Sequence, residues 1–485
     1  MPHAASTPIA LGAVLLAAAC ASRPAPPDLG ELYDALARSA HDRRNPVVMI
    51  PGVLGSSLRQ RGTGRRVWGA FTGDYANPGR ADGARLIALP MRAGAPLTEL
   101  VDDVYADGAL ESLEINLFGL PVNLAAYVHI LSALGVGGYR DESLGSEIDY
   151  GDEHFTCFQF AFDWRRDLSE NARLLDEFLD EKAEYVRRET KARYGIERGE
   201  IRFDFVCHSM GGLLLRYFLR YGGTPLPEDG SLPELTWAGA QRVERAVLVG
   251  TPNSGSAETL RELVEGVKFA FFLPRYSPAI LGTFPALYQL LPRVRHGVLV
   301  DAEDTEDSER SALDLFDPAL WERFGWGLVD PDQADALAEL LADVPSAAER
   351  RRIAADHLAK CLARARQFHA ALDRPARPPE GTELHLVVGD AVATPSRLAV
   401  DTETGAVRLT EPRPGDGTVL RSSALGDERV GGVWTPRLVS PIDWAHVLFL
   451  FEDHLGLTQA PAFIDNLLYL LLEEPREPLP QARVP

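Results

Sequence analysis

A short turn between an apolar run and a helical pattern is the feature that most limits how this chain can fold. Residues 203–206 are Phe-Asp-Phe-Val, which predicts a buried strand. The turn His208-Ser209-Met210-Gly211-Gly212 follows, and a helical pattern continues to Tyr221. A strand–serine–helix turn needs small residues beside the serine and projects the serine hydroxyl above the sheet. The turn therefore predicts that Ser209 is a nucleophile; the alternative is a purely structural turn.

Strand-like runs recur along the chain and alternate with helical patterns such as residues 168–193. This alternation is typical of a mostly parallel sheet flanked by helices. It stops between residues 256 and 380, where helix formers predict a cap inserted over the site. The sequence thus predicts an α/β-hydrolase fold with a mostly parallel sheet, an inserted helical cap and a lid loop. The runs expected as strands are residues 47–50, 158–162, 203–206, 246–249, 384–388 and 447–451.

The expected organisation has six parts. A signal peptide occupies residues 1–20, and a Pro-rich tether follows at 21–44. The first part of the hydrolase core, residues 45–255, contains an irregular lid region at about 57–140. The helical cap (256–380), the last part of the core (381–474) and a disordered tail (475–485) complete the chain.

The N-terminal residues are typical of an export signal. Residues 9–19 are apolar and small, and this stretch is too short to cross a bilayer. Cys20 directly follows it, which resembles a bacterial lipoprotein cleavage site where Cys20 would be lipidated. We therefore expect an exported lipoprotein, anchored to a membrane of the periplasm or cell envelope. The alternatives are an ordinary signal peptide and a misassigned start.

Charge and cysteine content exclude several functions. The chain has 70 acidic and 49 basic residues, for a net charge of -21. Such a balance repels nucleic acid, so we expect no nucleic-acid partner. Beyond Cys20 only Cys157, Cys207 and Cys361 occur, which is too few for a disulfide framework. No cysteine or histidine spacing suggests a metal site, and we expect neither a metal nor another cofactor.

The acid and the base must follow the nucleophile in the order serine, acid, histidine. Two acids come after the cap. Asp416 lies between two glycines that allow a tight loop to lift its carboxylate, and it is preferred over Asp390 at the end of an expected strand. His454 follows the last expected strand and is the preferred base. His446 precedes that strand and would lie at the opposite edge of the sheet.

Two backbone amides are expected to hold the oxyanion. One belongs to the residue after the nucleophile, which is Met210. The other must come from an earlier loop that follows a strand. Residues 51–55, Pro-Gly-Val-Leu-Gly, follow the first expected strand, and their glycines let the backbone approach a substrate. We therefore assign the second amide to Val53.

Taken together, these residues resemble the lecithin:cholesterol acyltransferase family, which includes lysosomal phospholipase and phospholipid:diacylglycerol acyltransferase. The resemblance implies an α/β-hydrolase fold and acyl-enzyme chemistry on lipid esters. It also supports Asp416 over Asp390 and His454 over His446. The segments that carry it are residues 46–56, Phe162-Asp163-Trp164-Arg165, residues 208–211, 250–256 and 415–419, and His454-Leu455.

The predicted function is that of a serine acyltransferase or lipase. It would act on lipid esters, with a phospholipid as the expected substrate, and transfer the acyl group to an alcohol or to water. The alternatives are a broad carboxylesterase or amidase on the same fold and a non-catalytic surface lipoprotein. Residues 57–100 contain no cysteine, so the lid disulfide of the animal proteins is absent, and the cap gives no support to sterol as the acceptor.

Contact with a membrane is expected through apolar groups, because the net charge opposes an anionic surface. Trp68 resembles the lid tryptophan that contacts lipid in the family, and Phe71 lies in the same loop. The cap offers Phe269-Ala270-Phe271-Phe272-Leu273. In both places the alternative is that the aromatic rings pack inside the protein.

Overall fold

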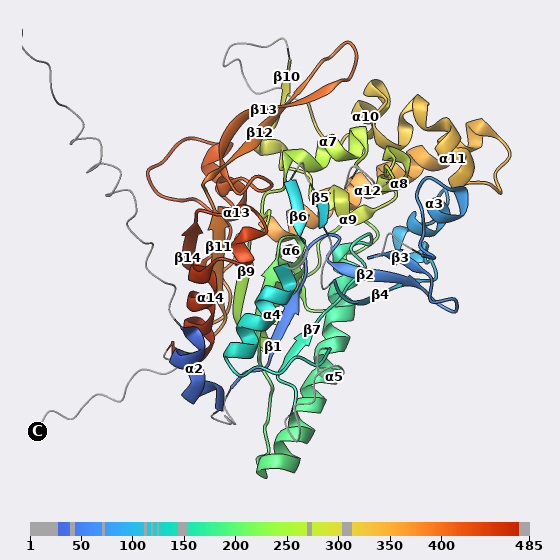
Figure 1. Cartoon of the computed structure of the whole chain (residues 1–485). Coiled ribbons are helices and arrows are strands. Elements are labelled where there is room, and N and C mark those ends of the chain that lie inside the picture. The colour runs from blue at the N-terminus through green and yellow to red at the C-terminus, as the bar shows by residue number, and fades with distance from the viewer. Residues whose placement is uncertain are drawn as a thin grey trace, which may run out of the picture.

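The central element of the computed structural model is a six-stranded parallel sheet (Figure 1). Its strand order is β14-β11-β9-β8-β1-β7, and every neighbouring pair runs parallel. The strands are β1 (Val47–Ile50), β7 (Cys157–Gln159), β8 (Phe203–His208), β9 (Val243–Val249), β11 (Glu383–Gly389) and β14 (Trp444–Leu450). The predicted fold class is thereby confirmed. The structure describes residues 28–38, 44–69, 73–110, 114–117, 120–123, 126–143, 154–268, 274–302 and 313–474.

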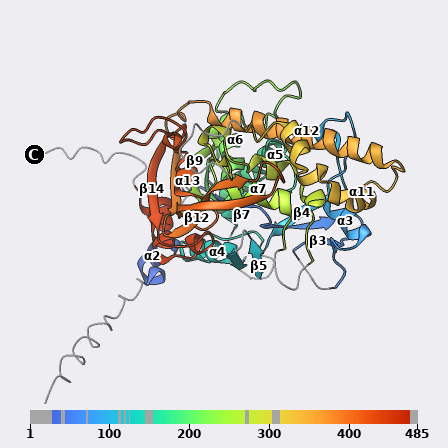
Figure 2. The ribbon, with the colours of Figure 1, turned by 90° about the horizontal axis from the view of Figure 1, so that it is seen from above.

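Helices cover both faces of this sheet. Helices α5 (Leu168–Tyr194) and α6 (Met210–Tyr221) pack together on one face, and α2 (Leu29–Arg38), α4 (Ala126–Val136) and α14 (Pro461–Leu468) lie on the other (Figures 1 and 2). Every residue of α6 is buried. A helix that is buried all round lies inside the core, so the turn at its N-terminus is held on every side.

Helix α2 falls within the stretch that the sequence suggested as a Pro-rich tether. Leu29, Tyr33 and Leu36 recur at helical spacing, and Tyr33 is 1 % exposed where α2 meets α4. A helix therefore occupies part of the predicted tether. The predicted signal peptide, the first residues of the tether and the tail at 475–485 lie outside the described residues.

Six α-helices lie in the described part of the stretch predicted as a cap. Helix α12 packs on α9 and also reaches α6, and Figure 1 shows this group above the sheet. The helices are α7 (Ala257–Glu265), α8 (Pro278–Leu281), α9 (Pro285–Gln289), α10 (Pro318–Phe324), α11 (Ala334–Leu340) and α12 (Ala347–Asp373). Among the described residues, no helix combines the length and apolar character needed to cross a bilayer.

Three smaller sheets differ from the sequence prediction. The region at 57–140 was expected to be irregular, yet it contains two of them. The third pairs a strand at residues 299–301, within the stretch predicted as a cap, with two nine-residue strands that follow β11. The strands of all three sheets carry polar or charged residues, so they lack the continuous apolar run that marks a buried parallel strand. The sheets are β3-β2-β4 (Arg66–Trp68, Ser56–Gln60, Val104–Ala109), β5-β6 (Glu114–Leu117, Leu120–Asn123) and β10-β12-β13 (Leu299–Asp301, Val392–Val400, Val407–Gly415).

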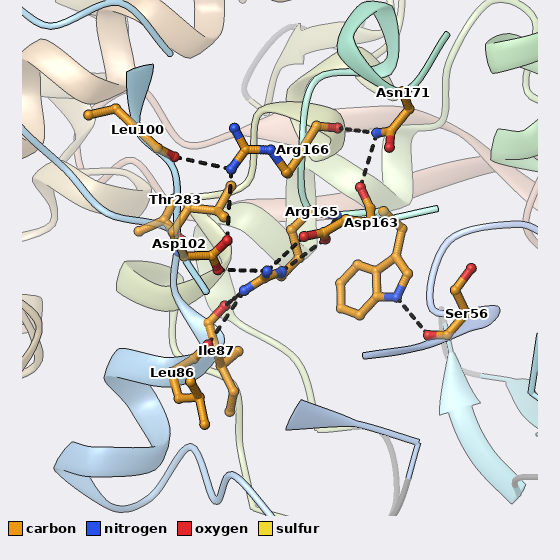
Figure 3. A network of polar contacts seen from close by, with 12 residues as sticks. Ser56, Leu86, Ile87, Leu100, Asp102, Asp163, Arg165, Arg166, Asn171 and Thr283 are labelled. Carbon is orange, nitrogen blue, oxygen red and sulfur yellow. Dashed lines mark hydrogen bonds and ion pairs between the residues drawn. The ribbon is translucent and has the colours of Figure 1, made fainter. Parts of the chain in front are cut away.

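The buried, positively charged side chain of Arg165 connects the segment after β7 to the region before α4 (Figure 3). The Arg165 side chain is fully buried and donates to Asp163 Oδ2 at 2.7 Å, to Asp102 Oδ2 at 2.8 Å and to the Ile87 carbonyl oxygen at 2.8 Å. Burial disfavours the charged guanidinium, but the two carboxylates outweigh this effect and raise the pKa of Arg165. Burial also raises the pKa of Asp102, against the influence of Arg165.

The neighbouring Trp164 extends this connection toward the site. Its Nε1 donates to the carbonyl oxygen of Ser56 at 3.2 Å, and Ser56 Oγ accepts from the amide of Phe162 at 3.1 Å. Ser56 opens β2, directly after the loop at residues 51–55. The Phe-Asp-Trp-Arg segment thus holds that loop against the core.

Four histidines are buried without a carboxylate partner strong enough to keep them charged. Burial lowers the pKa of His208 and His369 to about 3. It lowers the pKa of His357 and His385 to about 4. All four rings are therefore neutral in the folded protein at neutral pH.

From the lowered pKa values of these histidines, we predict that acid destabilises the folded protein. In the unfolded chain they take up protons below about pH 6.5, whereas in the folded chain they stay neutral down to about pH 4. The free energy of unfolding should therefore fall as pH drops from about 6.5 to 4, by about 1.4 kcal/mol per histidine per pH unit. Urea unfolding at pH 7.5, 6 and 5 measures this. In His357→Gln, the number of protons taken up on unfolding should fall by one, so the free energy of unfolding should depend less steeply on pH. A free energy of unfolding that is constant from pH 7.5 to 5 would contradict the interpretation.

Candidate active site

Asp416 and His454 lie in direct contact at the carboxyl edge of the central sheet. His454 Nδ1 and Asp416 Oδ2 are 2.8 Å apart, and the amide of His454 donates to the carbonyl oxygen of Asp416 at 2.9 Å. The two residues are 4 % and 1 % exposed. Because a carboxylate only accepts, Nδ1 carries the hydrogen. Nε2 of the neutral ring is then left as a proton acceptor.

The loop around Asp416 holds its carboxylate in place. Asp416 Oδ1 accepts from the amides of Thr418 at 2.9 Å and Val419 at 2.6 Å. Gly417 has a φ of +91°, a conformation that favours glycine. At the end of β11, a Cβ on Gly389 would lie 2.6 Å from the Asp416 Cβ. Glycines at both places therefore let the carboxylate approach the sheet edge.

Ser209 occupies a strained turn between β8 and α6. Its φ is +52° and ψ is -122°, and its amide donates to the Val249 carbonyl oxygen at 2.8 Å. A non-glycine residue in such a conformation costs about 1–3 kcal/mol and persists only where the surroundings enforce it. Here they do: a Cβ on Gly211 would lie 2.5 Å from the Pro51 oxygen, and one on Gly212 2.0 Å from Thr251 Oγ1.

Glycines at two further strand ends make room for Ser209 and His454. A Cβ on Gly52, after β1, would lie 2.9 Å from the Ser209 Cβ. Gly250, after β9, has a φ of +58°, and a Cβ there would lie 3.1 Å from the His454 ring. Ser209 Oγ makes no hydrogen bond to His454 in the described part of the chain. In unliganded sites such contacts are often long and shorten when substrate binds.

The amides of Val53 and Met210 hydrogen-bond to no described residue. Val53 lies in a turn closed by the Gly55 amide, which donates to the Gly52 carbonyl oxygen at 3.1 Å. Leu54 has a φ of +63°, a second strained position beside the site. Two unpartnered donors near a strained serine are what an oxyanion requires. Their assignment stays a prediction.

The alternative acid and base lie elsewhere. Asp390 accepts from Arg421 Nη1 at 3.3 Å. His446 lies within β14, its Nδ1 3.3 Å from His385 Nδ1, and the two rings are stacked with centroids 5.3 Å apart. The structure therefore brings Asp416 and His454 together, whereas Asp390 and His446 have other partners.

Trp68 lies inside the protein. It is 2 % exposed, its Nε1 donates to the Leu54 carbonyl oxygen at 2.8 Å, and its ring makes edge contacts with Trp164 and Tyr276. In this conformation a bilayer could not reach it, and packing is the role that these contacts support. Contact between Trp68 and lipid stays a prediction. Phe71 and residues 269–273, the other proposed contacts, lie outside the described residues.

One cluster of described residues has the composition of a metal site. Potential ligand atoms of Glu383, His385 and Glu474 all lie within 4.8 Å of one another. Arg245 Nε, however, donates to Glu474 Oε2 at 3.2 Å and lies 3.9 Å from Glu383 Oε2. The guanidinium already supplies the positive charge. Glu383 and Arg245 are near the starts of their strands, so the cluster is at the edge opposite Ser209.

A cleft of about 1020 Å³ lies between the β10-β12-β13 sheet and the loop after β9. Neither Ser209, Asp416 nor His454 lines it, but β13 leads from the cleft directly to Asp416. Two carboxylates, Asp301 and Glu411, also line it. Its basic residues are Arg397, Arg408, Arg413, Arg421 and His296. The cleft is thus rich in arginine although the chain as a whole is acidic.

Residues 147–314 match the model of the lecithin:cholesterol acyltransferase family. The match confirms the resemblance. The matched stretch contains Ser209 and the Phe-Asp-Trp-Arg segment, and it ends before Asp416 and His454. It supports an enzyme that transfers or hydrolyses lipid acyl groups.

A solved structure agrees with the fold. One chain in the crystal structure of the Tle4-Tli4 complex superimposes with a TM-score of 0.55 at 16% sequence identity, over 89% of this chain and 98% of that chain. At this identity the likeness concerns the fold alone. No curated protein sequence matches the chain.

Two features of the site were not found from the sequence. Tyr127 Oη accepts from the Gly52 amide at 2.8 Å and lies 3.2 Å from His208 Nδ1. The side chain of His208, directly before the serine in the sequence, connects Tyr127 to the carbonyl oxygen of His454. No motif surrounds Tyr127, and it lies 75 residues from Gly52 along the chain, so only the fold reveals the contact.

The contact between Asp416 and His454 predicts different outcomes for the two candidate acids. In Asp416→Asn, a side-chain amide would donate to His454 Nδ1 and leave the hydrogen on Nε2, where the ring could not accept a proton. Activity should fall by about 10³–10⁴. The matched control Asp390→Asn should stay within a few-fold of the wild type. Hydrolysis of a short nitrophenyl ester measures both, and the reverse order of losses would exclude Asp416 as the acid.

Proposed function

We propose that this protein is a serine acyl-hydrolase or acyltransferase acting on lipid esters, with Ser209, Asp416 and His454 as its catalytic triad. The observation that carries the proposal is the 2.8 Å contact between Asp416 and His454 beside the strained Ser209 turn. The match of residues 147–314 to a family of lipid acyltransferases supports the substrate class.

In the first step, His454 Nε2 accepts the proton of Ser209 Oγ as this oxygen attacks the ester carbonyl carbon. Asp416 stabilises the imidazolium that forms, and its contact with Nδ1 orients the ring. The amides of Val53 and Met210 donate to the oxyanion, each contributing about 3 kcal/mol to transition-state stabilisation. The carbon–oxygen bond then breaks, the leaving alcohol takes the proton from His454, and Ser209 carries the acyl group.

In the second step, His454 Nε2 removes a proton from an incoming alcohol or water, which attacks the acyl-enzyme. The intermediate collapses, and Ser209 Oγ recovers the proton. Transfer and hydrolysis therefore use the same residues. Which acceptor prevails depends on how well the closed site excludes water.

A phospholipid is the substrate that we favour. The arginine-rich cleft beside the Asp416 loop offers guanidinium groups, which bind phosphate oxygens well. Arg408 is exposed, and its guanidinium group makes no hydrogen bond to a described residue, so its side-chain donors are available. A phosphate in this cleft would lie on the side of the sheet from which an ester must approach Ser209.

A fluorophosphonate probe tests the nucleophile. The wild-type protein should be labelled, and Ser209→Ala should lose all labelling while circular dichroism shows that it remains folded. Undiminished labelling of Ser209→Ala would reject the assignment. A screen of phospholipids, neutral glycerides and short esters, each with acceptor alcohols present and read by mass spectrometry, then identifies the substrate. Turnover of short esters alone would support a carboxylesterase instead.

We further propose that the protein is exported and anchored through a lipid on Cys20. Cys20 follows a short apolar stretch and lies eight residues before Asp28, the first residue that the structure describes. The mature wild-type protein should partition into detergent, and Cys20→Ser should shift it to the aqueous phase because the acyl chains are lost. Partitioning of the unmodified protein into the aqueous phase would contradict the anchor.

A further inference from the structure

Two buried side chains next to the site have no part in the proposed mechanism. Tyr127 is 2 % exposed and comes from α4, and His208 is 3 % exposed and ends β8. Their rings meet edge to face with centroids 5.8 Å apart. His208 Nε2 lies 3.2 Å from the carbonyl oxygen of His454. Together they connect the loop after β1 to the loop that carries His454.

The partners determine where each hydrogen lies. The carbonyl oxygen of His454 only accepts, so His208 Nε2 must carry a hydrogen. Burial, followed by the nearby His454, lowers the pKa of His208 to about 3, so the ring is neutral and Nδ1 is an acceptor. Tyr127 Oη must therefore donate to Nδ1, and it accepts from the Gly52 amide.

We propose that Tyr127 and His208 are positioning residues that hold the oxyanion loop and the catalytic base in one fixed relation. Their hydrogen bonds all run in the same direction, from the Gly52 amide through Tyr127 and His208 to the backbone of His454. The inference rests on the proposed function, in which the amide of Val53, the residue after Gly52, holds the oxyanion and His454 is the base.

The hydrogen bonds through Tyr127 and His208 would position both the oxyanion donor and the base. The Gly52 amide belongs to the Pro51–Gly52 peptide unit, directly before the Gly52–Val53 unit whose amide would hold the oxyanion, so its hydrogen bond to Tyr127 restrains the start of that loop. At the other end, the His454 backbone is held by His208 through its carbonyl oxygen and by Asp416 through its amide. Displacements of about 1 Å at a reacting centre cost about a hundredfold in rate. A neutral His208 also keeps a second positive charge away from the His454 imidazolium, since the ring centroids are 4.8 Å apart.

The test compares Tyr127→Phe with Tyr221→Phe. Tyr221 is 1 % exposed and its hydroxyl donates to the Ala371 carbonyl oxygen at 2.9 Å, so the control removes an equally buried hydrogen bond at the far end of α6. Tyr127→Phe should lower kcat on a short ester by about tenfold to a hundredfold with KM nearly unchanged, and slow fluorophosphonate labelling equally. Tyr221→Phe should stay within about twofold of the wild type on both measures. Rates are expressed per folded molecule, with the folded fraction measured by near-ultraviolet circular dichroism.

A second variant, His208→Phe, breaks the connection at its middle and keeps a ring in place. It should reproduce the loss in kcat, which keeps the test decisive if Tyr127→Phe folds poorly. Wild-type rates in folded Tyr127→Phe or His208→Phe overturn the inference. So do equal losses in Tyr127→Phe and Tyr221→Phe, which indicate a general effect of stability. Absence of labelling in the wild type, by contrast, rejects the proposed function itself.

Discussion

The buried charge of Arg165 is the constraint on which the surroundings of the site depend. A fully buried guanidinium must be paired, and removing one partner of such a group costs about 3–5 kcal/mol. Arg165 finds its partners on two separate segments, Asp163 beside it and Asp102 on the region before α4. The adjacent Trp164 then donates to Ser56, the first residue after the loop at residues 51–55 that is proposed to hold the oxyanion. Arg165 and Trp164 together therefore connect the region before α4 to the segment after β7, next to this loop (Figure 3).

The parallel sheet determines where chemistry can occur. All six strands end at the same edge, so loops that are distant in sequence meet there. Space at that edge is short, and glycines provide it at the ends of three strands: Gly52 beside Ser209, Gly250 beside His454 and Gly389 beside Asp416. Each position would bring a Cβ to within about 3 Å of a proposed catalytic residue. Close packing of Gly211 against Pro51 and of Gly212 against Thr251 likewise leaves the strained Ser209 conformation no room to relax.

The six core strands could be predicted because each depends on a local pattern, and local patterns also singled out Asp416 and His454, which the structure brings into contact. Apolar runs mark strands buried on both faces, and Gly415-Asp416-Gly417 marks a tight loop. The small sheets could not be predicted this way, since β13 carries Arg, Glu and Pro residues and its pairing with β12 is set by the fold. Trp68 shows the opposite limit. A family motif suggested a surface role, but the two aromatic rings that pack against it, Trp164 and Tyr276, come from distant segments of the chain.

The hydrogen bonds from Gly52 to His454 imply that the two sides of the site act as a unit. The proposed base, His454, is held by Asp416 through its ring and by His208 through its backbone, and the second contact continues to the loop at residues 51–55. A shift of α4 that moves Tyr127 would therefore displace both this loop and the backbone of His454. Residues that share such a connection do not contribute independently. Packing around α4, on the face of the sheet opposite α6, can thus affect the proposed reaction at Ser209 through these contacts (Figure 1).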